Sequence, residues 1–593
     1  MFRSLRPLAP YFRRYKWQYV LSAFSVLLMN GIWVLFPQVL QYTVDGLKAG
    51  VSVHKLKVYS LLLIAVPLAK GVFQFLTRWV LIGISREIEF DLRNDLFAHL
   101  EGLSYSFYQR TRTGDIMARA TNDLNAVRML LGPAIMYTAN TVVFTAAALG
   151  FMVHISARLT LYAFLPLPLA SIAIQYFGKQ IHQRFERIQA MFSDISARVQ
   201  ENLSGVRVIK AYAQEQPEIE RFEADNQEYI ARSLKLVRLM GMLWPTLELL
   251  LGMGVVVVLW LGGREVLAGK ISLGRFVAFL AYITMLTWPI IALGWVINIF
   301  QRGTASLARL DELMKAPTEV RDEATARGKA ANIAGEIEFR NLTFAYPAAN
   351  AAAGNGPAGS GRPVLKHVSL RIPEGTSLAL VGPTGSGKST LVNLLPRTYD
   401  AEAGSVLIDG VPVREYPLAV LRRSIGFVPQ ETFLFSDSIR ENIAFGAEQA
   451  SDEEIHGAAE AANIAADIEG FPEQYATVVG ERGITLSGGQ KQRTAIARAL
   501  VRNPRILILD DALSSVDTYT EEKILNHLRD VMQGRTTIFI SHRVSTVRNA
   551  DQIAVLHDGE IVEVGTHDEL LSRNGYYTDL YNKQLLEEEL AGV

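Results

Sequence analysis

A glycine-rich segment in the C-terminal half of the chain has the residue types of a phosphate-binding loop. It runs from Gly382 to Thr390, reads GPTGSGKST, follows the apolar stretch Leu378–Val381 and precedes the helix-like stretch Leu391–Leu395. In such a strand, loop and helix, backbone N–H groups surround phosphates, a lysine reaches the terminal phosphates and a hydroxyl ligates magnesium. We therefore expect ATP and Mg²⁺ to bind here, through Gly382, Thr384, Gly385, Ser386, Gly387, Lys388, Ser389 and Thr390.

Magnesium needs a second ligand, and the segment Arg505–Asp510 offers one. Its sequence, RILILD, is an apolar run that ends in a carboxylate, which is the pattern of a buried parallel strand. Ligands of such sheets bind beyond the carboxyl ends of the strands, so Asp510 is expected beside the phosphate loop. The sequence thus predicts Ser389 and Asp510 as metal ligands.

The pentapeptide LSGGQ, Leu486–Gln490, opens a predicted amphipathic helix that reaches about Val501 and is stopped by Pro504. The side chain of Ser487 and the backbone amides of Gly488 and Gly489 then lie at a positive helix N-terminus, which favours a phosphate. The phosphates held by the chain's own loop are already bound. The expected ligand of this second site is therefore ATP on another nucleotide-binding domain.

These segments, in this order, resemble the ATPase domains of ABC transporters, and the resemblance covers essentially the whole chain. It implies that Tyr346 in FAYP stacks on adenine and that Gln430 contacts magnesium and senses the membrane domain. It also implies that Asp517 in SSVD crosses a dimer interface and that His542 in FISH contacts the γ-phosphate. The resemblance thus adds Gln430 and His542 to the expected catalytic residues. Gln490 is the last residue of the LSGGQ segment, which is expected to bind the partner's ATP.

One residue departs from the family pattern. After the magnesium aspartate, efficient ABC ATPases carry a glutamate that polarises the attacking water, whereas this chain has Asp511. The missing methylene retracts the carboxylate by about 1 to 1.5 Å, and misplacement near 1 Å can cost on the order of a hundredfold in rate. We expect slow hydrolysis at this site with nucleotide affinity little changed.

Two chains share each nucleotide site in this family, so the substitution has unequal consequences. The chain's own phosphate loop contributes one impaired site, while its intact LSGGQ completes the partner's site. This favours a heterodimer whose other half carries glutamate at the position of Asp511, as in heterodimeric bacterial multidrug exporters. The alternatives are a homodimeric exporter or lipid flippase with Asp511 as the base, and an ATP-gated channel or regulatory subunit.

The N-terminal half of the 593-residue chain contains six apolar stretches long enough to cross a bilayer. Four of them contain no charged residue, one contains only Glu248, and the sixth contains Lys70 and Arg78. The predicted spans are 19–42, 58–85, 130–153, 159–177, 240–261 and 276–300.

Six spans place both termini on one face, and the basic start of the chain together with the ATPase makes that face cytoplasmic. The expected location is the cytoplasmic (inner) membrane. The long charged connections 86–128 and 178–238 are expected to continue as helices out of the bilayer, whereas the outer connections are short. Within them, 107–123 and 201–215 resemble the intracellular loops of ABC exporters, whose short transverse helices dock on nucleotide-binding domains. The resemblance therefore favours export over import.

The predicted architecture is an α-helical six-span domain with long cytoplasmic extensions, 1–316, a linker, 317–335, and an α/β ABC nucleotide-binding domain, 336–593. The tract 348–361 is nearly all Ala, Gly, Asn and Pro and is expected to be a disordered surface loop.

The composition excludes several functions. Lys plus Arg and Asp plus Glu both number 59, so no overall positive charge indicates nucleic acid as a partner, and the absence of cysteine excludes disulfides and thiol chemistry. The predicted partners are a second half-transporter, the lipid bilayer and a small hydrophobic or amphipathic substrate. Charges at membrane depth are candidates to line the pathway, or equally to pair helices: Glu248, Lys70 and Arg78. Tryptophans of the spans suit apolar cargo or interfacial anchoring: Trp244, Trp260, Trp288 and Trp295.

Overall fold

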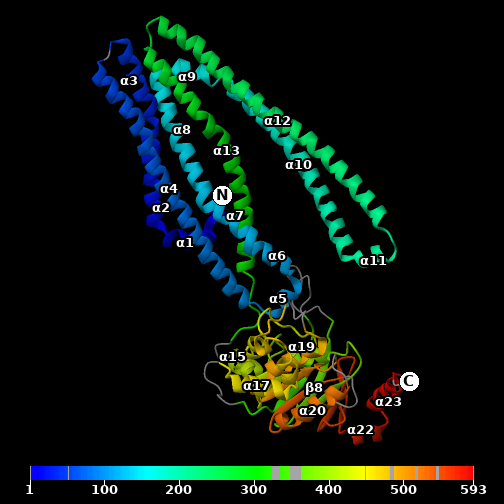
Figure 1. Ribbon diagram of the computed structural model, residues 1–593. Coiled ribbons are helices and arrows are strands. Elements are labelled where there is room, and N and C mark those ends of the chain that lie inside the picture. The colour runs from blue at the N-terminus through cyan, green and yellow to red at the C-terminus, as the bar shows by residue number, and fades with distance from the viewer. Residues whose placement is uncertain are drawn as a thin grey trace. The chain divides into compact units, whose positions relative to one another are not determined.

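The protein divides into two compact units (Figure 1). The computed structural model describes residues 2–50, 52–322, 333–346, 362–447, 449–480, 486–514, 518–541 and 547–591. One unit comprises residues 1–98 and 117–315, and the other comprises 99–116 and 316–593. The short segment 99–116, although it lies within the N-terminal half of the sequence, therefore packs with the C-terminal unit.

The described part of the N-terminal unit is helical, and two of the helices named below, Val53–Glu101 and Thr113–Ala118, extend into the segment 99–116 of the other unit. After a short 3₁₀ turn, Phe2–Leu8, its helices are α1 (Ala9–Arg14), α2 (Lys16–Val34), α3 (Phe36–Lys48), α4 (Val53–Glu101), α6 (Thr113–Ala118), α7 (Leu124–Met129), α8 (Ile135–Ile155), α9 (Ala157–Ala163), α10 (Leu167–Ser204), α11 (Val206–Ala211), α12 (Glu215–Leu267) and α13 (Leu273–Met314). Two π-helical turns, Arg119–Asp123 and Leu130–Ala134, join α6, α7 and α8 into one continuous run.

Six apolar helical runs form the transmembrane domain, as the sequence predicts. They are Lys16–Lys48, Val53–Glu101, Thr113–Ile155, Ala157–Ser204, Glu215–Leu267 and Leu273–Met314, and each contains one of the predicted spans. Helix α4 has 49 residues and α12 has 53. At about 1.5 Å per residue these helices are about 73 and 80 Å long, far more than the roughly 30 Å of a bilayer core.

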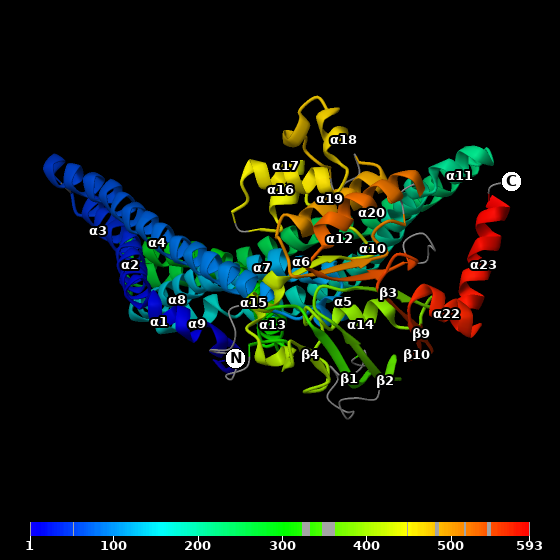
Figure 2. The same cartoon turned by 90° about the horizontal axis from the view of Figure 1, so that it is seen from below.

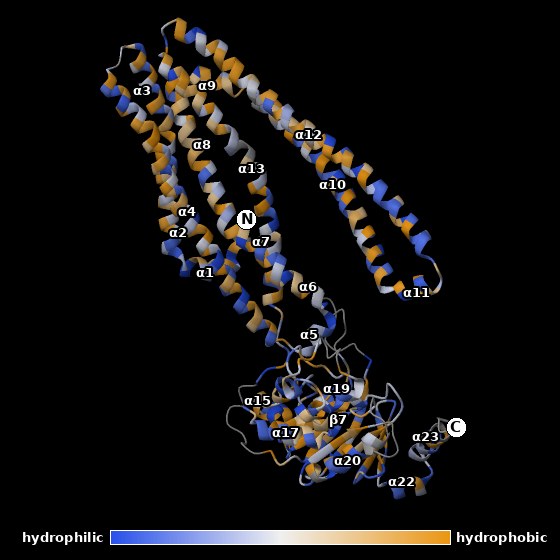
Figure 3. Cartoon of the chain, viewed as in Figure 1, coloured by the Kyte–Doolittle hydropathy of each residue, from blue (hydrophilic) through white to orange (hydrophobic). Residues whose placement is uncertain are grey.

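Helix α13 is the centre of the packing in this unit, because α3, α7 and α8 all contact it. Its residues Phe279 and Tyr282 are fully buried together with Ala148 and Met152 of α8. Helices α10 and α12 instead pack mainly against each other and are joined through α11. Figure 3 shows that hydrophilic residues gather in the parts of α10 and α12 next to α11, as expected for extensions beyond a bilayer.

The described part of the C-terminal unit contains two sheets. The smaller has the order β2-β1-β4-β5 and is antiparallel, and the larger has the order β10-β9-β3-β8-β7-β6 with five parallel strands and the antiparallel edge strand β10. The strand bounds are β1 (Ile337–Phe344), β2 (Leu365–Ile372), β3 (Ser377–Val381), β4 (Val406–Ile408), β5 (Val411–Pro412), β6 (Ile425–Val428), β7 (Ile506–Asp510), β8 (Thr536–Ile540), β9 (Gln552–His557) and β10 (Glu560–Gly565).

The helices of this unit are α5 (Tyr105–Arg110), α14 (Lys388–Asn393), α15 (Leu418–Ser424), α16 (Ile439–Ala444), α17 (Asp452–Ala461), α18 (Ala465–Glu469), α19 (Gly488–Leu500), α20 (Thr518–Met532), α22 (His567–Arg573) and α23 (Tyr576–Ala591). One buried cluster joins both sheets and α14, and another joins β6 and β7 to α16, α17 and α19. Figure 2 shows α16, α17 and α18 on one flank of the unit and β1, β2 and β4 on the opposite flank.

Candidate nucleotide site

The phosphate-binding loop connects the central strand β3 to helix α14. Every residue of β3 is buried, so the loop starts from a rigid position at the carboxyl edge of the parallel sheet. Gly382 has a φ of +149°, and a Cβ atom there would lie 2.1 Å from the carbonyl oxygen of Leu556. Gly387 has a φ of +105° and caps α14, so the helix begins at Lys388, three residues earlier than the sequence indicated. Side chains larger than hydrogen would disrupt the loop at both positions.

Lys388 is a buried cation at the start of α14. Its Nζ atom donates hydrogen bonds to the carbonyl oxygens of Gly382, at 2.8 Å, and Pro383, at 2.9 Å. Burial lowers the pKa of Lys388, an effect that the nearby carboxylates of Asp510 and Asp511 oppose. The ammonium group is thus held at the loop, and the nearby carboxylates balance its positive charge only in part. A phosphate is therefore a suitable ligand for it.

The hydroxyl of Ser386 gives a second indication of an anionic ligand. Ser386 is only 4% exposed, and its Oγ atom is buried without a hydrogen-bond partner. A buried hydroxyl that makes no hydrogen bond costs free energy, so a group that accepts from it is expected in the functional state. A phosphate oxygen in the loop fits that requirement.

Ser389 and Asp510 are brought together as the sequence predicts. Ser389 lies in the first turn of α14, Asp510 ends β7, and the Ser389 Oγ donates to the Asp510 Oδ1 at 3.0 Å. Asp510 is 3% exposed, and burial raises its pKa, with the Ser389 hydrogen bond opposing the rise. A buried carboxylate beside a hydroxyl, both oxygen donors, is chemically suited to Mg²⁺.

Asp511 follows the metal aspartate in a left-handed backbone conformation. Its φ is 50°, and its N–H donates to the carbonyl oxygen of Ile540, the last residue of β8, at 2.9 Å. Both Asp510 and Lys388 are close enough for Asp511 to affect their pKa values. The Asp511 carboxylate therefore lies at the same edge of the sheet, on a backbone fixed by the neighbouring strand.

Gln430 and Tyr346 approach this edge from two other directions. Gln430 is exposed and follows β6, whose last residue pairs with Leu509 of β7, so Gln430 lies just beyond the strand next to Asp510. Tyr346 follows β1, is half-buried, and its hydroxyl shares a 2.8 Å hydrogen bond with the Thr390 Oγ1 of α14. Of the predicted site residues, the structure thus places Tyr346 and the Ser389–Asp510 pair at the phosphate loop, and Gln430 just beyond the strand next to Asp510.

The LSGGQ segment lies elsewhere in the unit, on helix α19. Ser487 is the N-cap: its Oγ accepts from the Gln490 N–H at 3.3 Å, and its own N–H donates to the Gln490 Oε1 at 3.0 Å. The Gln490 side chain is further held by Asp467 of α18 at 3.0 Å. This capping box orders the helix N-terminus. In the described part of the chain, no hydrogen bond joins Ser487–Gln490 to the phosphate loop.

Three expectations lie outside the described residues. They are Asp517, His542 and the tract 348–361.

The structure adds residues that motif reading missed. Tyr105 of α5 contacts Tyr399 edge-on, with ring centroids 6.0 Å apart, and Tyr399 contacts Tyr346 edge-on at 5.2 Å. Ser104 and Ser106 donate to the carboxylate of Glu319. Segment 99–116 is therefore held in the C-terminal unit by an aromatic row that ends at the predicted adenine-stacking residue. Its overlap with 107–123 was the only sequence signal for this contact.

The charged residues at membrane depth line two cavities of the N-terminal unit. Lys70 and Arg78 line one together with Gln74, Trp33 and Trp288, and the Lys70 Nζ lies 4.6 Å from the centre of the Trp33 ring. Glu248 lines another cavity, between α9, α12 and α13. The four tryptophans named from the sequence are all exposed on the chain.

Comparisons with known proteins agree with this architecture. The family model of the ABC transporter transmembrane region matches residues 19–290, and that of the ABC transporter ATPase, described as "ABC transporter", matches 365–514. The chain is 37% identical to the probable multidrug resistance ABC transporter ATP-binding/permease protein YheI of Bacillus subtilis, with 100% of both chains covered. It is also 37% identical to an ATP-dependent lipid A-core flippase of Syntrophus aciditrophicus, over 91% of this chain and 87% of the relative.

Among solved structures, a bacterial Atm1-family ABC exporter with ATP bound matches with a TM-score of 0.77 and 30% identity. The match covers 96% of this chain and 98% of the exporter. The chain is therefore an exporter-type, multi-pass member of the ABC transporter superfamily, with a six-helix transmembrane domain fused to an ABC nucleotide-binding domain.

Proposed function

We propose that this chain is one half of a dimeric exporter that uses ATP to move hydrophobic or amphipathic compounds across the cytoplasmic membrane, and that its own nucleotide site hydrolyses ATP slowly. The observation that carries the slow site is Asp511, a short carboxylate on a backbone fixed to Ile540. The relatives named for multidrug resistance and lipid A-core flipping support export and an amphipathic cargo.

A dimer is supported by the surface of α11, the short helix between α10 and α12. None of its residues is buried, and large apolar side chains on and beside it are exposed, with Val208 at 61% and Tyr212 at 75%. An exposed apolar surface at the end of two long helices is suited to contact another protein chain. A second half-transporter, with its own nucleotide-binding domain, fits this surface.

The proposed roles of the described site residues are supported by their contacts, and those of Asp517 and His542 rest on the family resemblance alone. The phosphate loop and Lys388 hold the phosphates, and Tyr346 contacts the adenine. Ser389, Asp510 and Gln430 would hold Mg²⁺, which would supply positive charge beside the phosphates. Asp511 orients and deprotonates the attacking water, with His542 beside the γ-phosphate, while Asp517 and the Ser487–Gln490 segment act at the partner's nucleotide.

The unequal sites favour a heterodimer in which the partner supplies a glutamate at the equivalent position. ATP binding closes the two nucleotide-binding domains, and segment 99–116 transmits the closure through its contacts with Tyr399 and Glu319. Hydrolysis at the partner's site then resets the dimer. In this arrangement both termini and the nucleotide-binding domain are cytoplasmic.

Magnesium-dependent ATP hydrolysis by this chain alone, in lipid nanodiscs, tests the slow site. ATP binding with turnover close to that of the Lys388→Ala blank supports the proposal. Rapid turnover that the blank lacks contradicts it and establishes a competent homodimer with Asp511 as the base. The lipid flippase relative makes that homodimer the second candidate, assayed by lipid movement between leaflets.

Uphill transport in inverted vesicles, measured with the partner present, distinguishes an exporter from an ATP-gated channel or regulatory subunit. An exporter accumulates substrate against its gradient when ATP is added outside. A channel only equilibrates it, and that result would contradict the proposal.

A further inference from the structure

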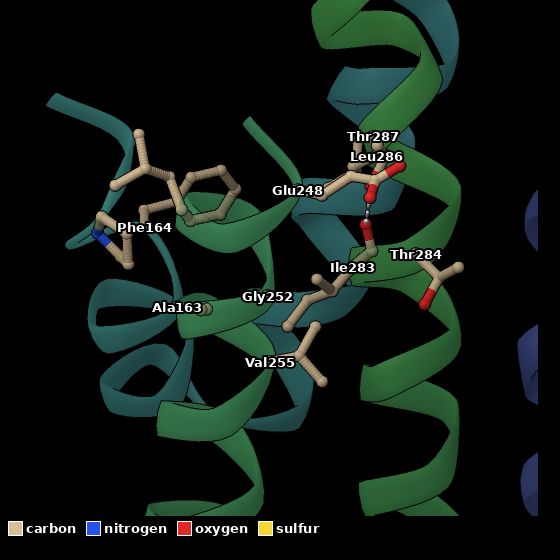
Figure 4. A pocket seen from close by; sticks show the side chains of 12 residues that line it. Ala163, Phe164, Glu248, Gly252, Val255, Ile283, Thr284, Leu286 and Thr287 are labelled. Atoms are coloured by element: carbon tan, nitrogen blue, oxygen red, sulfur yellow. Dashed lines mark hydrogen bonds between the residues drawn. The ribbon is translucent and has the colours of Figure 1, made fainter. Parts of the chain in front are cut away.

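The cavity that contains Glu248 lies between three membrane helices and is partly open, and Glu248 itself is exposed. Ala163 and Phe164 come from the end of α9, Glu248 and Gly252 come from α12, and Thr287 comes from α13. Its volume is about 240 Å³. Figure 4 shows the Glu248 side chain reaching from α12 toward Thr287, with Phe164 on the opposite side. The cavity thus offers apolar and aromatic walls and one carboxylate.

Glu248 lies at membrane depth. It is eight residues after Met240 and thirteen before Leu261, the ends of the apolar stretch of α12. At about 1.5 Å per residue, the carboxylate is attached roughly 12 Å inside the stretch from one end and 20 Å from the other. A charge at such a depth is costly and indicates a functional role or a partner.

No partner among the described residues explains this charge. Glu248 is the only ionisable residue among those described around the cavity. No lysine, arginine or histidine in the described part of the chain forms an ion pair with it, although the described ion pairs include many on the helices outside the bilayer. The negative charge is therefore available to a ligand.

Two glycines of α12, Gly252 and Gly254, line the cavity. A Cβ atom at Gly254 would lie 3.2 Å from the carbonyl oxygen of Ala163, so α12 and the end of α9 approach closely there. A Cβ atom at Gly252 would meet nothing within 4 Å. The helices are thus held together on one side of the cavity, while the missing side chain of Gly252 leaves its interior open.

We propose that this cavity binds amphipathic organic cations, with Glu248 pairing with the positive charge and Phe164 contacting the apolar or aromatic body. A single carboxylate on apolar walls complements a single positive charge on an apolar molecule, and an aromatic face adds to the attraction of a cation. The cavity at Lys70 and Arg78 has the opposite charge and would not bind such a ligand. This inference rests on the proposed export function and names its substrate class.

Equilibrium binding to nucleotide-free protein in nanodiscs tests it without requiring transport. The probes are ethidium, an aromatic cation, and Nile red, a neutral apolar dye. Glu248→Gln should weaken ethidium binding by about tenfold or more, because a charge-assisted contact is lost, and should leave Nile red binding within about twofold. Glu265→Gln, which removes a carboxylate of α12 beyond the apolar stretch, is the matched control and should change neither.

Gly252→Leu tests the cavity itself, because it fills the open space and keeps the charge. It should weaken ethidium binding, whereas a normal ethidium affinity in this variant would place the cation elsewhere. Two results with Glu248→Gln would also overturn the proposal. An equal loss of affinity for both dyes would show that the carboxylate has a structural role, and an unchanged affinity for ethidium would show that it does not bind the cation. ATP binding by each variant verifies folding.

A measurement on the unmodified protein completes the test. Dicyclohexylcarbodiimide, an apolar carboxyl reagent, should label Glu248, and ethidium should slow that labelling while leaving the Glu265 peptide unaffected. Labelling of Glu248 at the same rate with and without ethidium would contradict the site. Both experiments are independent of ATP turnover, so a failed export function leaves the binding result interpretable, and a failed binding result leaves export untouched.

Discussion

Replacing Asp511 with glutamate lengthens one side chain of the nucleotide site by a methylene group and keeps its carboxylate. The backbone cannot shift to compensate, because the Asp511 N–H donates to Ile540 at 2.9 Å in a left-handed conformation with a φ of 50°. The extra C–C bond is about 1.5 Å long, so the carboxylate advances by about 1 to 1.5 Å. The variant thus places its charge where an ABC catalytic glutamate is expected.

The expected gain in rate follows from that distance. Misplacement of a reacting group by about 1 Å costs on the order of a hundredfold, so Asp511→Glu should raise magnesium-dependent turnover about a hundredfold, equivalent to about 2.7 kcal/mol. Affinity for ATP should change by less than about twofold, because Lys388, Ser389 and the loop are unaltered. Stability should fall by less than about 1 kcal/mol, since aspartate tolerates the left-handed conformation better than glutamate.

The assay is phosphate release at saturating ATP in nanodiscs, with a fluorescent ATP analogue to measure binding. Asp511→Asn, which keeps the length and removes the charge, should be as slow as the Lys388→Ala blank. A rate for Asp511→Glu within about twofold of the unmodified chain, with binding and folding intact, would refute the reasoning and show that the length of this side chain does not limit hydrolysis.

Three further predictions concern the nucleotide-binding unit. Gly382→Ala should abolish ATP binding in a fluorescence titration, because its Cβ atom would lie 2.1 Å from the Leu556 carbonyl oxygen, whereas retained binding would show that the loop can shift. Lys388→Met should raise the Tm of the nucleotide-free protein at neutral pH by removing a buried cation. Burial lowers the pKa of Lys388, so between that lowered pKa and 10.5 the folded protein loses the proton that the unfolded chain retains. The Tm advantage of the Lys388→Met variant should therefore shrink as the pH rises through this range. A Tm difference that does not depend on pH would contradict this. Tyr105→Ala should leave ATP binding unchanged and, in the dimer with its partner, reduce the stimulation of ATPase activity by ethidium, since it removes the edge contact with Tyr399. Undiminished stimulation would show that this aromatic row carries no coupling.

Much of the architecture can be predicted from short segments of the sequence. The six spans are visible because each is a long apolar run, and all six occur as helices in the structure. The phosphate loop and α19 are also recognisable from local features, the glycine spacing of the loop and the Ser487 cap of the helix. The start of α14 at Lys388 also depends on a neighbouring residue, Gly387. The positive φ of Gly387, however, is not apparent from the sequence pattern.

The tertiary structure decided which distant residues meet and in what surroundings. The sequence predicts that Ser389 and Asp510 approach each other, because parallel strands align their carboxyl ends, but their hydrogen bond and the raised pKa of Asp510 arise from burial. Segment 99–116 joins Tyr399 and Glu319 through contacts about 200 to 300 residues apart in sequence. The resemblance of 107–123 to a docking loop indicates such a contact but not these partners.

Glu248 illustrates the same division. Its sequence context gives the charge and its depth in an apolar helix. Whether that charge pairs with another helix or faces an open cavity depends on how α9, α12 and α13 pack around Gly252 and Gly254. Periodicity and motif spacing determine elements because they act between near neighbours, whereas the environment of a side chain is set by packing between elements far apart in the chain.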